Sequence, residues 1–188
     1  MRAEPQDSAE RRTRLLRREE FERMVEVDLF RGERIELIRG CLVERSPQNV
    51  AHAAAIQILT RLLMPALVGR ADVRVQLPFV AGDDSLPEPD LAIVAAERFL
   101  SSHPDKAFLI IEVANTSLGF DRREKAEFYA QAEIPEYWVV NLVARIIERH
   151  SEPAAGAYTR VTPFGAGETI APLAFGDVAL KVNDVFGL

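Results

Sequence analysis

The spacing of apolar and polar residues along this chain predicts alternating helices and strands. Apolar residues recur at helical spacing in three segments, 13–27, 50–67 and 122–132. A short helical turn is expected at 96–100. Thr13 is the expected N-cap of the first helix. Asp121, with Glu124 three residues later, resembles a capping box and predicts the start of the helix at 122.

Strand patterns fill most of the remaining chain. Residues 34–38 and 41–44 flank Arg39-Gly40, which predicts a hairpin with a two-residue turn. Further strands are expected at 73–77, 91–94, 108–113, 136–140, 146–150 and 158–162, followed by short strands and turns in 164–188. Two of these runs are apolar, 91–94 throughout and 108–113 except at Glu112, which is typical of strands covered on both faces.

The order of these elements predicts an α/β (α+β) fold. Through the middle of the chain it runs helix, strand, strand, strand, helix, strand, an αβββαβ core with a mixed central sheet flanked by helices. An N-terminal helix and hairpin and a C-terminal β extension complete it. A length of 188 residues with 48% apolar residues suits one domain, expected at 13–188 after a disordered N-terminal arm at 1–12.

Composition excludes several classes of protein. A single cysteine, Cys41, excludes a disulfide framework and a cysteine-rich zinc site. The absence of a signal peptide and of a long apolar run predicts a cytoplasmic protein with no membrane partner. The net charge of −6 argues against a sequence-independent coat for nucleic acid. It leaves a nuclease possible, because metal-binding acids lower the net charge.

Arginines crowd the segment 11–18, which contains five of them. A solvated arm or helix start is the favoured interpretation, and an arm that seeks phosphate is the alternative.

Three charged residues stand in apolar surroundings. Asp90 and Glu112 each adjoin an expected strand, and Lys125 falls in the first turns of the following helix. Burying a lone carboxylate costs several kcal/mol unless a cation or hydrogen bonds compensate. Two acids on adjacent strands and a lysine from the next helix would form a site for a divalent metal and a phosphate. Each residue also has a simpler explanation. Asp90 fits a turn former, Glu112 an acid paired with an arginine, and Lys125 a solvated surface lysine.

These residues resemble the PD-(D/E)xK nucleases, in which Pro-Asp opens the second core strand and Glu ends the third. More narrowly, the chain is similar, from Leu16 to His150, to a widespread bacterial family described as "putative restriction endonucleases". The matching blocks are 35–44, Ser46-Pro47 with His52, 89–94, and 111–140 with Asp121, Lys125 and Tyr129. One departure concerns Ala114, which stands where the superfamily carries its lysine. The resemblance implies that Lys125 supplies this group from the helix.

The resemblance implies a metal-dependent endonuclease of restriction endonuclease-like fold that hydrolyses DNA phosphodiester bonds, leaving 5′-phosphate and 3′-hydroxyl ends. Its cofactor would be Mg²⁺, with Mn²⁺ as a substitute, held by Asp90, Glu112 and the backbone carbonyl of Val113. Lys125 would hold or activate the attacking water, or stabilise charge on phosphoryl oxygens. A homodimer is expected from the class, because cutting two strands commonly takes two active sites.

Glu36 and His52 complete the candidate catalytic set. Glu36 lies inside an apolar strand pattern, and superfamily sites often take a further acid from an element before the sheet. His52 near the start of the long helix could reach the metal's water shell or a phosphate, and a hydrogen-bonded structural histidine is the alternative. Tyr137 and Trp138 are expected in the core or a dimer interface rather than stacked on bases.

Two rival functions stay open at this stage. One is a catalytically silent nuclease-fold module that binds nucleic acid or a protein partner. The presence of Asp90, Glu112 and Lys125 together argues against it, since a scaffold has no need of all three. The other is an enzyme of different chemistry on the same fold, which is disfavoured because no nucleophile–base pair stands out.

Overall fold

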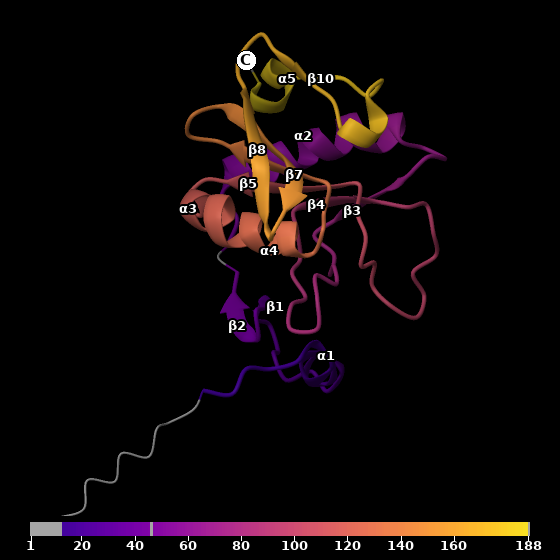
Figure 1. Ribbon diagram of the computed structural model, residues 1–188, viewed down its shortest axis with the longest axis vertical. Helices are drawn as coiled ribbons and strands as arrows, with labels where there is room; N and C mark the ends of the chain where they lie inside the picture. The colour runs from indigo at the N-terminus through magenta and orange to yellow at the C-terminus, as the bar shows by residue number, and fades with distance from the viewer. Residues whose placement is uncertain (1–12, 46, 188) are drawn as a thin grey trace, which may run out of the picture.

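A computed structural model describes residues 13–45 and 47–187; the arm expected at 1–12 lies outside the described residues. The centre of the fold is a six-stranded sheet in the order β3-β4-β5-β6-β7-β8 (Figure 1). The strands are β3 (Asp72–Val75), β4 (Leu91–Val94), β5 (Leu109–Ala114), β6 (Glu136–Asn141), β7 (Ile146–Ala154) and β8 (Ala157–Phe164). Strands β5 and β6 are parallel, whereas the other neighbours are antiparallel. The predicted mixed sheet is confirmed.

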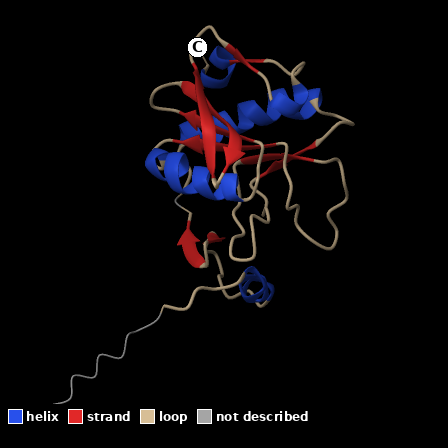
Figure 2. Cartoon of the chain, viewed as in Figure 1, coloured by secondary structure: helices blue, strands red, loops and turns tan. Residues whose placement is uncertain are grey.

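Helices cover both faces of this sheet (Figures 1 and 2). The long helix α2 (Val50–Ala66) and the C-terminal α5 (Val182–Phe186) pack together on one face. The connection between β5 and β6 covers the other face, as the continuous helical segment α3 (Leu118–Phe120), a π-helical turn (Asp121–Lys125) and α4 (Ala126–Gln131). The predicted αβββαβ order is therefore observed.

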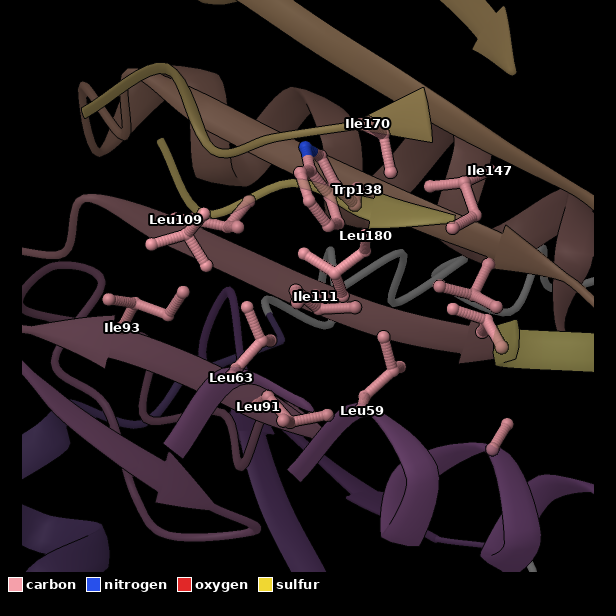
Figure 3. Packing of buried hydrophobic residues seen from close by; sticks show 14 of the residues in the cluster. Leu59, Leu63, Leu91, Ile93, Leu109, Ile111, Trp138, Ile147, Ile170 and Leu180 are labelled. Atoms are coloured by element: carbon pink, nitrogen blue, oxygen red, sulfur yellow. The ribbon is translucent and has the colours of Figure 1, made fainter. Parts of the chain in front are cut away.

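The alternation of side chains along the strands divides the core in two. Leu109, Ile111 and Trp138 point into the cluster beneath α2 (Figure 3). Ile110 and Tyr137 point the other way, into the cluster beneath α4. Because successive side chains alternate, Glu112 lies on the α4 side, between apolar neighbours. Tyr137 and Trp138 are both fully buried, which confirms their expected place in the core.

The N-terminal part forms a smaller unit beside the sheet (Figure 1). It consists of helix α1 (Arg18–Glu26) and the hairpin of β1 (Ile35–Ile38) and β2 (Cys41–Glu44), with the expected turn at Arg39-Gly40. The hairpin is joined to the segment before β4, since Leu37 bridges Leu86 and the Gly40 amide donates to the Asp84 carbonyl. This junction brings the hairpin close to the start of β4.

The C-terminal extension packs beside α2, on the same face of the sheet. It contains β9 (Thr169–Ile170), a 3-10 turn (Leu173–Phe175), β10 (Leu180–Lys181) and α5. The fully buried Glu136 fastens it to the sheet, because Oε1 accepts a hydrogen bond from Trp138 Nε1 at 2.7 Å and Oε2 accepts one from the Leu173 amide at 2.6 Å. The expected short strands are present, and the helix α5 was not predicted.

The predictions of where helices begin were wrong at two places. The first helix starts at Arg18 rather than Thr13, because the Leu16 amide donates to the Gly40 carbonyl and holds that segment extended against the hairpin. The helical segment after β5 starts at Leu118 rather than Arg122.

Two smaller predictions in the same regions were also wrong. Asp121 is inside the helical segment, where its carboxylate accepts a hydrogen bond from the Ser117 hydroxyl at 2.6 Å instead of capping the helix. Residues 96–100 are irregular, with bends at Ala96 and Leu100, rather than a helical turn. Phe99 packs against the α4-side cluster and beneath the Arg74 guanidinium.

Candidate active site

Asp90 and Glu112 meet because of the register between β4 and β5. Leu91 pairs with Ile111 in this antiparallel ladder, so the next pair outward is Asp90 opposite Glu112. Both side chains face the α4 side of the sheet and are almost fully buried, with 1% and 2% exposure. The Val113 amide donates to Asp90 Oδ2 at 2.9 Å, which fixes the carboxylate against β5.

The helical segment after β5 contributes a cation and a hydroxyl to Glu112. Lys125 Nζ lies 2.8 Å from Glu112 Oε1, and Tyr129 donates its hydroxyl to the same oxygen at 2.9 Å. Lys125 and Tyr129 are one helical turn apart, so they project from one face. Asp121, four residues before Lys125, places Oδ1 3.8 Å from the ammonium group. The structure therefore brings together the three residues singled out in the sequence.

Asp90 is surrounded by four hydrogen-bond donors. Oδ1 accepts from Arg45 at 3.1 Å and from Gln76 at 3.2 Å. Oδ2 accepts from the Val113 amide and lies 3.1 Å from His52 Nε2. A carboxylate offers about four acceptor sites, so every site on Asp90 is occupied. His52 comes from the first turn of α2, whose N-cap Asn49 accepts a hydrogen bond from the His52 amide.

Glu36 lies beside this group without contacting Asp90 or Glu112 in the hydrogen-bond network. It is 2% exposed, accepts a hydrogen bond from the Glu88 amide at 2.9 Å and lies 3.4 Å from Arg45 Nε. Its contacts tie the hairpin to the segment before β4, and Arg45 connects it to Asp90.

One cavity of about 200 Å³ is lined by most of the charged groups described above: Glu36, Arg45, His52, Asp90, Glu112, Asp121 and Lys125. Its walls are formed by the end of the hairpin, the start of α2 and the loop after β5, which contributes Asn115, Thr116 and Ser117. This polar loop is thus part of the cavity lining. Glu44 also lines the cavity and is exposed.

The buried acids outnumber the permanent cations around the cavity. Burial raises the pKa of Glu112 to about 8, with the nearby acids adding to the effect and Lys125 opposing it. Burial also raises the pKa of Asp121, again against Lys125. Burial alone would lower the pKa of Lys125, but the charges of Glu112, Glu36 and Asp121 raise it instead. Lys125 therefore stays an ammonium at neutral pH, in a region short of positive charge.

Asp90 is held as the anion. Burial opposes ionisation, yet the hydrogen bond and charge of His52, together with the Val113 amide, bring the Asp90 pKa below its ordinary value. The effect is mutual: burial would lower the His52 pKa, but Asp90 raises it. Asp90 is thus a carboxylate at neutral pH. Its negative charge in turn favours the protonated form of His52.

The donor set fits a hard divalent cation. Among the residues that the structure describes, no group of three or more His, Cys, Asp or Glu side chains is arranged to hold a metal ion. Magnesium requires less, since it is usually bound through one or two carboxylates with water and phosphate oxygens. Asp90 and Glu112 supply two such carboxylates, and a cation beside Glu112 would oppose the effect of burial on its pKa. The conflict is at Asp90, whose acceptor sites are all filled.

Sequence reasoning missed Arg45 entirely and gave no role to Tyr129. Arg45 follows an exposed strand, where an arginine signals nothing unusual, yet its side chain is only 12% exposed. Tyr129 had a usable signal, because its place four residues after Lys125 puts both on one helical face. Asp121 was assigned to helix capping and instead lines the cavity.

Comparisons with known proteins agree with this architecture. A family model, Uma2, described as "Putative restriction endonuclease", matches residues 18–183. No curated protein matches the chain. No helix within 13–45 and 47–187 has both the length and the apolar character needed to cross a membrane.

Two solved structures are similar to this chain. A crystal structure of a "putative nuclease belonging to DUF820" from Anabaena variabilis ATCC 29413 aligns with a TM-score of 0.66 and 13% identity, over 81% of this chain and 89% of that one. The type IIG restriction endonuclease BpuSI aligns with a TM-score of 0.41 and 17% identity, over 73% of this chain and 14% of that one. The first of these matches shows a restriction endonuclease-like nuclease fold.

Proposed function

Because this chain belongs to the Uma2 family, described as "Putative restriction endonuclease", we propose that it is a metal-dependent endonuclease that hydrolyses DNA phosphodiester bonds. The observation that carries the proposal is the single cavity in which Asp90, Glu112 and Lys125 come together. Two carboxylates can hold a divalent cation that polarises a phosphate, and an ammonium group can stabilise charge on the phosphate oxygens.

Asp90 and Glu112 would hold the cation, Mg²⁺ or Mn²⁺, with the backbone carbonyl of Val113 as a further oxygen ligand. A cation held there would polarise a phosphate and would lower the pKa of an attacking water. The Val113 amide fixes Asp90, and Tyr129 fixes Glu112, so both carboxylates are oriented before any ligand arrives. Such preorganisation avoids rearrangement during the reaction.

Lys125 is the proposed catalytic cation. It remains charged at neutral pH, and a phosphate entering the cavity would place developing negative charge near its ammonium group. The same group can orient the attacking water. His52 and Glu36 are proposed as positioning residues: His52 holds Asp90 Oδ2, and Glu36 holds the Glu88 amide and Arg45.

The proposal extends to the setting of the reaction. DNA is the proposed substrate, and a homodimer is proposed because cleavage of both strands commonly takes two active sites. A cytoplasmic location is proposed to match a chromosomal or incoming DNA substrate.

The test is cleavage of supercoiled plasmid by purified protein with Mg²⁺ or Mn²⁺, followed by gel electrophoresis. Asp90→Asn, Glu112→Gln and Lys125→Met should each lower the rate at least about 100-fold, the usual effect of removing one group that stabilises the transition state. The matched control is Lys106→Met, which removes an exposed lysine outside the cavity and should leave the rate unchanged.

Circular dichroism must show that each variant is folded. Wild-type protein that shifts DNA mobility but never cuts it, with or without metal, would support the silent binding module instead. Cleavage that persists in all three cavity variants would place the active site elsewhere.

A further inference from the structure

The side chain of Arg45 occupies the acidic side of the cavity. Its three nitrogens each lie near a different carboxylate: Nη2 is 3.1 Å from Asp90, Nε is 3.4 Å from Glu36, and Nη1 is 3.4 Å from Glu88. Burial alone would lower the Arg45 pKa, but the surrounding acids raise it. The guanidinium is therefore a permanent cation placed where the acids converge.

Arg45 also competes with any ligand of Asp90. The Val113 amide belongs to the β5 backbone and cannot leave its carboxylate without disrupting the sheet. Gln76 is neutral and can remain beside a metal-bound carboxylate. Arg45 carries a full charge that would repel a divalent cation at this distance. Of the donors to Oδ1, Arg45 is the one that a cation must displace.

The location of Arg45 permits such a displacement. Arg45 directly follows strand β2, which belongs to a two-stranded sheet. Most residues of β2 are exposed. The stem of Arg45 is long and flexible, and the residue lines the wall of the cavity. The guanidinium can leave the acids by side-chain rotation, with the hairpin unchanged.

We propose that Arg45 is a built-in counter-cation, which neutralises Asp90 and Glu36 in the metal-free protein and swings away when a divalent cation binds Asp90. This inference rests on the proposed metal-dependent function and adds a regulation of the same site. It implies that Arg45 lowers the affinity for the metal while keeping the empty acidic cavity stable.

Isothermal titration with Mn²⁺ alone tests the competition. Arg45→Gln should bind Mn²⁺ at least about tenfold more tightly than wild type, because a charge next to the ligand has been removed. Arg45→Lys keeps the charge and should stay within about threefold of wild type. Arg70→Gln, which removes an exposed arginine paired with Asp177 and outside the cavity, should change nothing.

A second measurement uses the wild-type protein, in case Arg45→Gln fails to fold. Nitrogen-15 NMR of the arginine Nε–H groups should show faster exchange of the Arg45 proton with water once Mg²⁺ is added. Arg45→Lys identifies the signal by its loss. Arg149 is the internal control, since its Nε lies 2.8 Å from buried Glu136, outside the cavity, and its exchange should not change.

The outcomes separate the two proposals. Equal Mn²⁺ affinity in wild type and Arg45→Gln, or an Arg45 signal unaffected by Mg²⁺, overturns the counter-cation inference and leaves the nuclease proposal standing. Failure of wild type and Arg45→Gln alike to bind Mn²⁺ overturns both. Tighter binding by Arg45→Gln that is abolished by adding Asp90→Asn supports both.

Discussion

Tyr129 gives the most direct test of how Glu112 is oriented. Its hydroxyl is fully buried and donates to Glu112 Oε1 at 2.9 Å. Tyr129→Phe should lower plasmid cleavage about tenfold, since the carboxylate loses an orienting donor, and should lower the free energy of unfolding by about 1 kcal/mol. Tyr158→Phe is the matched control, because that hydroxyl bonds the Ile134 carbonyl outside the cavity.

Both variants should lose similar stability in urea unfolding, and only Tyr129→Phe should lose activity. Equal cleavage rates in the two variants would show that the hydroxyl of Tyr129 is structural.

The buried His150 should make the free energy of unfolding depend on pH. Burial lowers its pKa, with Glu148 opposing and Arg122 adding to the shift. Below about pH 6.5, the ordinary histidine pKa, the unfolded chain binds this proton while the native protein resists it. The free energy of unfolding should therefore fall as the pH falls through that range, and His150→Gln should weaken the dependence.

Urea unfolding at about pH 5.5 and about pH 7.5 measures this difference. Tyr158→Phe is again a suitable control, because it alters the packing next to His150 without removing a group that titrates there. A slope in His150→Gln equal to that of wild type would mean that His150 titrates normally in the native protein.

The residues of the site differ in how far the sequence could predict them. Asp90 and Glu112 could be found because a charge inside an apolar strand pattern requires a partner. Arg45 could not be found, because its burial depends on Glu88 and Asp90, which lie 43 and 45 positions further along the chain. The pattern of residues around Arg45 contains no information on contacts with residues so distant in the sequence.

At the scale of elements, the β1–β2 hairpin determines whether Glu36 and Arg45 reach the cavity. Gly40 in its turn has φ +75°, and a Cβ there would lie 2.6 Å from the Leu15 Cβ and 3.0 Å from the Leu16 carbonyl. Gly40→Ala should lower the free energy of unfolding by about 3 kcal/mol, from the left-handed backbone and the clash together. It should also lower cleavage, because the hairpin would shift.

Gly32→Ala is a control that separates the two contributions. Gly32 has φ +77°, and a Cβ there would meet no atom within 4 Å, so only the backbone cost of about 1 kcal/mol should appear. Chemical denaturation of both variants gives the comparison. If both variants lost the same free energy of unfolding, the hairpin would accommodate the Cβ at Gly40 without further destabilisation.

Elements were predictable where their pattern was local. The central strands β4 and β5 follow from short apolar runs, and α2 follows from apolar residues at helical spacing. The start of the helix after β5 did not, because Asp121 and Glu124 satisfy the sequence pattern of a capping box. In the structure the chain already turns at Ser117, whose carbonyl accepts the Asp121 amide. The same short polar side chain can serve either role, and only tertiary packing decides.

At the scale of the whole molecule, net charge opposes the proposed substrate. The chain carries −6, and four buried acids line the cavity: Glu36, Asp90, Glu112 and Asp121. Arg45 and Lys125 are engaged with these acids rather than available to a phosphate. A DNA strand approaching the cavity of the metal-free protein therefore finds both of these cations already paired, and the net charge of the chain repels it.

This balance predicts that metal is needed to bind DNA as well as to cut it. Lys125→Met retains both carboxylates and should cut too slowly to interfere with a binding measurement. Its affinity for a DNA duplex, measured by fluorescence anisotropy at constant ionic strength, should be at least about tenfold higher with Mn²⁺ than with EDTA. Adding Asp90→Asn should remove the difference. Equal affinity with and without metal would mean that DNA binds through a surface remote from the cavity, where the acids exert no repulsion.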